Sequence, residues 1–171
     1  MKNIIITGLP RSGKSTLLAK LVLGFDKKVG FITKEILVNQ GRVGFEVENH
    51  LGQKFTLAHI NFETDIQVAK YFVKIESLNE VIPSITKFDS EDLLYLDEIG
   101  QMQLHSNKFR DLVVAYLNSE NLFISTLSAV YNDDFTDFIR KRSDVSIIEI
   151  TPENREEKFL DLRNLLKDRN D

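Results

Sequence analysis

Residues 8–16 read Gly-Leu-Pro-Arg-Ser-Gly-Lys-Ser-Thr and fit the pattern G-x-x-x-x-G-K-[ST]. The preceding residues 3–7 are rich in isoleucine, which is typical of a buried strand. The following residues 15–23 have helical spacing and stop at Gly24. A strand, a glycine-rich turn and a helix in this order are the setting in which the pattern forms a phosphate-binding loop. This stretch therefore constrains the fold more than any other.

The residue types in this loop suit the binding of a polyphosphate. Gly8 and Gly13 permit backbone angles that a Cβ atom would disfavour. Backbone N–H groups then turn inward, and the helix N-terminus adds its partial positive charge. Lys14 would bring a full charge to the β- and γ-phosphates, and the Ser15 hydroxyl could bind a Mg²⁺ ion that bridges them.

A second chemical feature is a pair of carboxylates at the end of an apolar run. Residues 93–96 are Leu-Leu-Tyr-Leu, and Asp97 and Glu98 follow directly. At the carboxyl end of a parallel strand, Asp97 would point into the ligand crevice and hold Mg²⁺ directly or through a water. Glu98 could align a water against the γ-phosphate and accept its proton. On its own the pair also fits acids that merely cap the next turn, and the upstream phosphate loop favours the functional interpretation.

The rest of the chain alternates between strand and helix patterns. This alternation predicts an α/β fold of three layers, a mostly parallel sheet covered on both faces, with residues 1–171 forming one domain. An antiparallel meander is expected near residues 36–60, where strand patterns flank turns such as Asn39-Gln40-Gly41. The expected strands are 3–7, 28–33, 36–38, 43–47, 54–58, 71–75, 92–97, 121–126 and 145–150. The expected helices are 15–23, 77–88, 106–118, 133–142 and one opened by Thr151 and Pro152 that frays over residues 167–171.

Composition argues against several other functions. The formal net charge is −4, with 22 basic and 26 acidic residues, so no molecule-wide positive field favours nucleic acid or anionic lipid. The chain has no cysteine, and its three histidines lack metal-ligand spacing, which excludes disulfides and disfavours a zinc site. No apolar run has membrane-spanning length and the N-terminus lacks the layout of a signal peptide, so we expect a cytoplasmic protein.

Several motifs together resemble the small THEP1-type nucleoside-triphosphatases, and the resemblance covers nearly the whole chain. The more specific motifs are a glycine-containing hairpin set and an Asp-Glu-Ile-Gly run. The motifs that carry the resemblance are residues 7–17, 30–35, 41–45, 97–109 and 151–155. The resemblance implies a P-loop NTPase fold and Mg²⁺-dependent hydrolysis of ATP, GTP and other nucleoside triphosphates to the diphosphate and phosphate, with loose base preference.

The resemblance also implies roles for individual residues. The implied catalytic residues are Lys14, Glu98 and Arg155, and the implied magnesium ligands are Ser15 and Asp97. The implied nucleotide contacts are Gly8, Leu9, Pro10, Arg11, Ser12, Gly13, Lys14, Ser15, Thr16, Gly100 and Gln101. The chain departs from the family pattern at Lys34, where an acid is expected, at Gln101 and Gln103, and in residues 68–73, which lack the usual glycines.

An arginine that reaches the γ-phosphoryl group is worth about 10³–10⁵ in rate. The candidates are Arg11, Arg140, Arg142 and Arg155, of which Arg155 matches an Asn-Arg pair of the family and could instead contact the base. Arg42, on the expected hairpin, could face a second ligand.

Two alternatives to hydrolysis use the same phosphate loop. One is a kinase that transfers the γ-phosphoryl group to a nucleoside, a nucleotide or another hydroxylated molecule, with Glu98 as base for the acceptor. It is mildly disfavoured because the chain shows no separate arginine-rich lid insertion. The other is a nucleotide-dependent switch, in which the exposed edge of the meander would offer a protein partner a place to dock.

Overall fold

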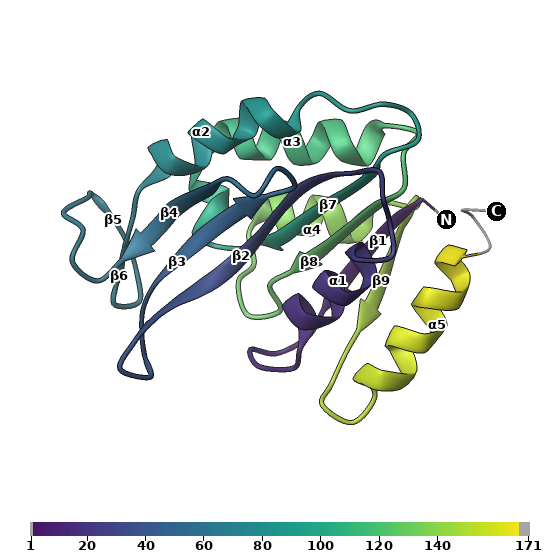
Figure 1. Ribbon diagram of the computed structural model, residues 1–171, viewed down its shortest axis with the longest axis horizontal. Coiled ribbons are helices and arrows are strands. Elements are labelled where there is room, and N and C mark those ends of the chain that lie inside the picture. The colour runs from purple at the N-terminus through teal and green to yellow at the C-terminus, as the bar shows by residue number, and fades with distance from the viewer. Residues whose placement is uncertain (1, 168–171) are drawn as a thin grey trace.

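The computed structural model describes residues 2–167 and has one nine-stranded sheet at its centre (Figure 1). The strand order is β5-β6-β4-β3-β2-β7-β8-β1-β9. The strands are β1 (Asn3–Thr7), β2 (Lys28–Val38), β3 (Gly41–Asn49), β4 (Lys54–His59), β5 (Ile66–Val68), β6 (Tyr71–Val73), β7 (Leu93–Ile99), β8 (Phe123–Leu127) and β9 (Val145–Glu149). The expected fraying over residues 167–171 falls mainly outside the described part of the chain.

The sheet has a parallel half and an antiparallel half that share β2. Strands β2, β7, β8, β1 and β9 pair in parallel, while β2, β3, β4, β6 and β5 pair antiparallel. The expected meander is thus an extension of the main sheet, and it continues to Val73 because β6 pairs with β4. Residues 28–33 and 36–38, expected as two strands, form one, since Lys34 and Glu35 continue the ladder with β3.

Helices cover both faces of the sheet, as the sequence predicts. They are α1 (Lys14–Val22), α2 (Ile75–Ile85), α3 (Asn107–Asn118), α4 (Asp134–Lys141) and α5 (Arg155–Lys167), with a short 3₁₀ turn at Gln103–His105. Helices α1 and α5 pack together on one face, and α2 and α3 pack together on the other (Figure 1). Strand β1 divides its side chains between the two cores, Ile4 and Ile6 on the α1 side and Ile5 on the other, so both of its faces are buried.

Two helix starts differ from the sequence-based prediction. Helix α2, expected from residue 77, already begins at Ile75 after Lys74, which offers no side-chain cap. Regular α5 begins at Arg155, preceded by a turn in which Thr151 and Asn154 each accept a bond from the other's backbone N–H. The expected cap at Thr151 therefore holds this turn, and its carbonyl still accepts from Arg155 N–H at 3.1 Å.

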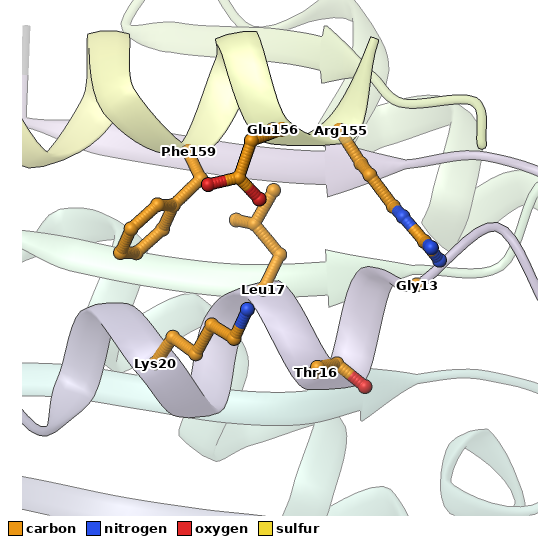
Figure 2. A pocket seen from close by; sticks show the side chains of 7 residues that line it. All are labelled: Gly13, Thr16, Leu17, Lys20, Arg155, Glu156 and Phe159. Atoms are coloured by element: carbon orange, nitrogen blue, oxygen red, sulfur yellow. The ribbon is translucent and has the colours of Figure 1, made fainter. Parts of the chain in front are cut away.

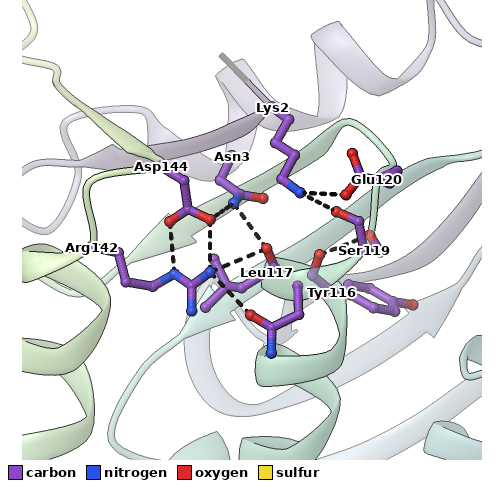
Figure 3. A network of polar contacts seen from close by, with 9 residues as sticks. Lys2, Asn3, Tyr116, Leu117, Ser119, Glu120, Arg142 and Asp144 are labelled. Carbon is purple, nitrogen blue, oxygen red and sulfur yellow. Dashed lines mark hydrogen bonds and ion pairs between the residues drawn. The ribbon is translucent and has the colours of Figure 1, made fainter.

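A polar network anchors the start of β1, the strand next to the edge strand β9 (Figure 3). The Asn3 side chain donates to the Leu117 carbonyl at the end of α3 (3.0 Å) and to Asp144 Oδ2 (3.2 Å). Arg142 clamps the same Asp144 carboxylate through Nε (2.8 Å) and Nη2 (2.7 Å), and this partner lowers the pKa of Asp144. The network ties β1, α3 and the segment before β9 together at the edge of the sheet opposite the phosphate loop.

Within residues 2–167, no helix has both the length and the apolar character that crossing a bilayer would require.

Candidate active site

The loop between β1 and α1 has the conformation that anion binding by backbone amides needs. Gly8 (φ 153°) and Gly13 (φ 98°) lie in the region that favours glycine. A Cβ atom on Gly8 would meet the Ile150 carbonyl oxygen at 2.4 Å, so the turn also depends on close packing against the chain after β9. Arg11 at the loop tip has φ 65°, a costly angle for a residue with a side chain. The loop therefore curls back over the start of α1.

Lys14 closes this loop from inside. Its Nζ donates to the carbonyls of Gly8 (2.9 Å) and Leu9 (3.1 Å), and its side chain is largely buried. Ser12 is also buried, and its Oγ has no partner within the described residues. Held this way, the Lys14 ammonium lies over the concave side of the loop, where a polyanion would replace the carbonyls as its partner.

Asp97 lies at the carboxyl end of β7 inside a set of hydroxyl donors. Its Oδ1 accepts from Ser15 Oγ (2.9 Å) and from Thr126 Oγ1 of β8 (2.6 Å), and its main-chain carbonyl accepts from Thr33 Oγ1 of β2. Asp97 is 1% exposed. Burial raises the pKa of this carboxyl, while the Thr126 and Ser15 hydrogen bonds and the Lys14 charge act in the opposite direction.

The second carboxylate oxygen of Asp97, Oδ2, receives no hydrogen bond from the surrounding hydroxyl groups. Oδ2 is buried and has no hydrogen-bond partner among the described residues, an arrangement that costs free energy unless another group satisfies it. Magnesium prefers hard oxygen ligands and commonly takes only one or two from the protein, with waters and phosphates supplying the rest. A buried carboxylate oxygen beside the Ser15 hydroxyl fits that requirement. Residues 2–167 contain no cluster of three or more His, Cys, Asp or Glu side chains that could hold a metal without further ligands.

Glu98 is partly buried next to Asp97 and carries the titration behaviour expected of a base. Burial, followed by the neighbouring charge of Asp97, raises the pKa of Glu98 to about 7, and the Lys14 ammonium lowers it only in part. Gly100 makes room for this side chain, because a Cβ atom there would lie 2.6 Å from Glu98 Oε1. A carboxyl group with a pKa near 7 can take up and release a proton at neutral pH.

One cavity of about 780 Å³ brings most of the predicted residues together. Its lining includes Lys14, Ser15, Asp97 and Glu98. From the predicted nucleotide contacts it also includes Gly8, Pro10, Arg11, Gly13, Thr16 and Gln101. Leu9, Ser12 and Gly100 do not line it: Leu9 offers its carbonyl to Lys14, Ser12 is buried within the loop and Gly100 lies behind Glu98. The volume lies in the range of small-molecule sites.

Arg155, predicted as a catalytic residue, does not line the 780 Å³ cavity. It projects from the first turn of α5 toward Gly13 and Thr16, and lines a separate cavity of about 200 Å³ between α1 and α5 (Figure 2). A Cβ atom on Gly13 would lie 3.3 Å from Arg155 Cδ, which puts the guanidinium against the outside of the phosphate loop. Arg155 thus adjoins the loop without lining the cavity that holds Asp97 and Glu98.

Of the other candidate arginines, Arg140 and Arg142 hold structural contacts, while Arg11 lines the larger cavity. Arg140 supports the loop after β8 through the Ser128 carbonyl (2.9 Å), and Arg142 is held by Asp144 in the network of Figure 3. Within the described part of the chain, Arg11 and Arg42 are the arginines that line the 780 Å³ cavity.

The sequence analysis did not place Thr33 and Thr126 at the site. Thr33 follows the part of β2 that pairs with β7, residues 28–32, and Thr126 lies near the end of β8. Both side chains donate to Asp97. Hydroxyl residues near the carboxyl ends of neighbouring parallel strands were a usable signal, because such strand ends share one edge of the sheet.

Comparison with known proteins agrees with this geometry. A family model described as NTPase matches residues 3–162. The Nucleoside-triphosphatase THEP1 of Thermotoga maritima is 35% identical over 166 residues, which cover 96% of this chain and 95% of the relative. The crystal structure of THEP1 from the hyperthermophile Aquifex aeolicus superimposes with a TM-score of 0.86 at 33% identity, covering 96% of this chain and 98% of that one. The solution structure of a human cancer-related nucleoside triphosphatase gives a TM-score of 0.83 at 25% identity, with 98% of each chain covered. The chain therefore belongs to the family of THEP1-type nucleoside-triphosphatases.

Proposed function

We propose that this protein hydrolyses nucleoside triphosphates at the γ-phosphate in a Mg²⁺-dependent reaction with broad base preference. The observation that carries the proposal is the meeting of Lys14, Ser15, Asp97 and Glu98 in one cavity at the phosphate loop. These groups supply the cation, the metal ligands and the base that phosphoryl transfer to water uses. The names of the relatives support the same reaction class.

The phosphate loop and Lys14 bind and orient the triphosphate. On binding, the Lys14 ammonium exchanges the Gly8 and Leu9 carbonyls for phosphate oxygens. The backbone N–H groups of the loop and of the α1 N-terminus donate to oxygens of the same triphosphate. Ser15 and Asp97 would hold Mg²⁺, whose charge, when bound, offsets the negative charge on the β- and γ-oxygens. The Thr126 hydroxyl keeps the Asp97 carboxylate oriented.

Glu98 acts as the base toward water. Its carboxylate accepts a proton from the attacking water as the bond from water oxygen to γ-phosphorus forms and the bond to the diphosphate oxygen breaks. A pKa of about 7 lets the carboxylate be unprotonated in part of the population at neutral pH and basic enough to accept the proton.

Broad base preference follows from a shallow site for the nucleoside. The smaller cavity adjoins the loop at Gly13 and Thr16, and its other walls are Leu17, Lys20, Arg155, Glu156 and Phe159. At about 200 Å³ it lies below the range of about 300–1,000 Å³ typical of sites that bury a whole drug-sized ligand, so a nucleoside there would remain partly exposed. A guanidinium group stacks on any planar ring, so contact with Arg155 would bind purines and pyrimidines alike.

Phosphate release from ATP, GTP, CTP and UTP, measured with and without Mg²⁺, tests the proposal. We expect all four to be hydrolysed only with Mg²⁺, and Glu98→Gln to lose about 10²–10⁴-fold in rate while retaining nucleotide binding. Glu46→Gln, the same chemical change on β3 outside the cavity, is the matched control. Equal rates in Glu98→Gln and Glu46→Gln would overturn the role of Glu98, and no phosphate release from any triphosphate would overturn the function.

A further inference from the structure

The 780 Å³ cavity extends beyond the catalytic residues to a wall made by the antiparallel half of the sheet. We name this wall, formed by Glu35 of β2, Arg42 and Phe45 of β3 and Tyr71 of β6, the distal wall. In the strand order, β7 with Glu98 lies between the strands of the distal wall and β9, which leads into Arg155 and α5. If the nucleoside leaves the phosphate loop toward Arg155, the distal wall lies on the opposite side of the γ-phosphate and faces a second molecule.

The distal wall is rigid around Arg42. The guanidinium donates from Nε to Tyr71 Oη (2.8 Å) and from Nη1 to Glu35 Oε1 (2.7 Å). Its carbon lies 5.1 Å from the ring centre of Phe45 and 5.6 Å from that of Tyr71, and the two rings pack edge to face with centres 5.0 Å apart. Two hydrogen bonds and two aromatic faces hold the group in one position, so a ligand would meet a preorganised surface.

The charges of the distal wall are balanced. Arg42 is paired with Glu35, and the neighbouring Lys34 is paired with Glu48 at 2.6 Å. A strongly anionic or cationic ligand would have to compete with these pairs. The pair of Arg42 and Glu35 keeps free capacity, since Nη2 and Oε2 have no partner within residues 2–167. A guanidinium N–H donor beside a carboxylate acceptor matches hydroxyl groups, which donate and accept at once.

From this geometry we propose that the distal wall binds a neutral, polyhydroxylated ring compound, a nucleoside or a sugar, whose hydroxyl group accepts the γ-phosphoryl group in place of water. The proposal rests on the proposed function, because it uses the same triphosphate site. The hydroxyl oxygen forms a bond to the γ-phosphorus as the bond from that phosphorus to the β-bridging oxygen breaks. The hydroxyl proton passes to the Glu98 carboxylate, and the products are the phosphorylated acceptor and the nucleoside diphosphate. The acceptor ring packs on Phe45, which the buried Tyr71 supports from behind, and its remaining hydroxyls bind Glu35 and Arg42.

The test supplies acceptors to the full-length protein with Mg²⁺ and ATP and identifies products by ³¹P NMR and mass spectrometry. One arm contains adenosine, guanosine, cytidine and uridine, and the other contains ribose and glucose. The measured quantity is the ratio of phosphorylated acceptor to free phosphate. Glu35→Gln and Arg42→Gln should each lower this ratio about tenfold or more, since each removes charge-assisted hydrogen bonds. Glu46→Gln, on β3 but outside the cavity, should leave it at the wild-type value.

The outcomes separate the two proposals. A phosphorylated nucleoside or sugar whose yield saturates with acceptor and falls in the distal-wall variants supports the inference, and the productive arm identifies the acceptor. Free phosphate without any phosphorylated acceptor overturns the inference and leaves hydrolysis standing. A phosphorylated acceptor at an unchanged ratio in Glu35→Gln and Arg42→Gln overturns the assignment to the distal wall. Neither phosphate nor phosphorylated acceptor overturns the inference together with the proposed function.

Discussion

The raised pKa of Glu98 predicts a specific pH dependence of hydrolysis. The base must be unprotonated to accept a proton, so activity rises as pH rises through the pKa of Glu98. In the free enzyme this pKa is about 7, raised by burial and by the charge of Asp97. The profile of kcat/KM reports ionisations of the free enzyme, so it is the quantity to measure.

The magnitude follows from the position of the pKa. With a pKa near 7, the carboxylate fraction is about one-eleventh at pH 6 and about ten-elevenths at pH 8, so kcat/KM should rise about tenfold between them. A glutamate with an ordinary pKa of about 4.3 would be more than about 95% ionised across that whole range and would give no rise. The profile therefore distinguishes a buried base beside Asp97 from an exposed, unperturbed carboxylate.

The assay is initial phosphate release from low concentrations of the Mg²⁺–ATP complex with little free Mg²⁺, so that the free enzyme holds no metal at Asp97, measured from pH 5.5 to 8.5 at constant ionic strength. The γ-phosphate of the substrate titrates in the same region, and the Glu98→Gln variant corrects for it because the substrate is identical in both enzymes. The ratio of wild-type to variant kcat/KM should retain the tenfold rise. A ratio that stays constant from pH 6 to pH 8 would refute the claim that Glu98 is the titrating base.

Three further predictions concern the loop, the metal and a turn. Lys14→Ala should weaken triphosphate binding and abolish turnover, and titration calorimetry that returned wild-type affinity would contradict the placement of phosphates at Gly8 and Leu9. Ser15→Ala should raise the Mg²⁺ concentration needed for half-maximal phosphate release, because one hydroxyl beside Asp97 is lost; an unchanged requirement would remove Ser15 from the metal site. Gln40→Gly should stabilise the fold by about 1 kcal/mol, or about 2–4 °C in the thermal midpoint, since Gln40 has φ 65° in the turn between β2 and β3; a lower midpoint would contradict this account of the turn.

Local patterns predicted much of the parallel half of the sheet. Strand β1 lies at the residues expected, Asn3–Thr7, because a short isoleucine run has no alternative burial that suits it better. Helix α3, expected over residues 106–118, spans Asn107–Asn118, and Ser106 caps it by accepting from Phe109 N–H at 3.1 Å. The antiparallel half was harder to predict. Residues 28–38 form one strand because β7 pairs with residues 28–32 and β3 with residues 31–38, and β5, at 66–68, exists only through pairing with β6. Such pairing is tertiary and leaves little trace in the strand's own sequence.

In the candidate site, the sequence predicted the residues that belong to two contiguous motifs, the phosphate loop and the carboxylate pair. Lys14, Ser15, Asp97 and Glu98 line one cavity, as expected from the loop and the carboxylate pair. The sequence could not predict which side chains from separate helices and strands contact one another. Arg155 belongs to an Asn-Arg pair that says nothing about which side of the loop α5 approaches, and it lines the smaller cavity. Thr126 reaches Asp97 only because β8 lies beside β7.

The central claim is that the amides of residues 8–16, the Lys14 ammonium and one Mg²⁺ ion together hold a triphosphate beside Glu98. A crystal structure of the protein with Mg²⁺ and a non-hydrolysable triphosphate tests it most directly. We predict the phosphate chain inside the loop, Lys14 Nζ moved from the Gly8 and Leu9 carbonyls onto phosphate oxygens, and the metal at Ser15 Oγ, with Asp97 binding it directly or through a water. A loop that stays empty at saturating ligand, or a triphosphate bound elsewhere, would contradict it.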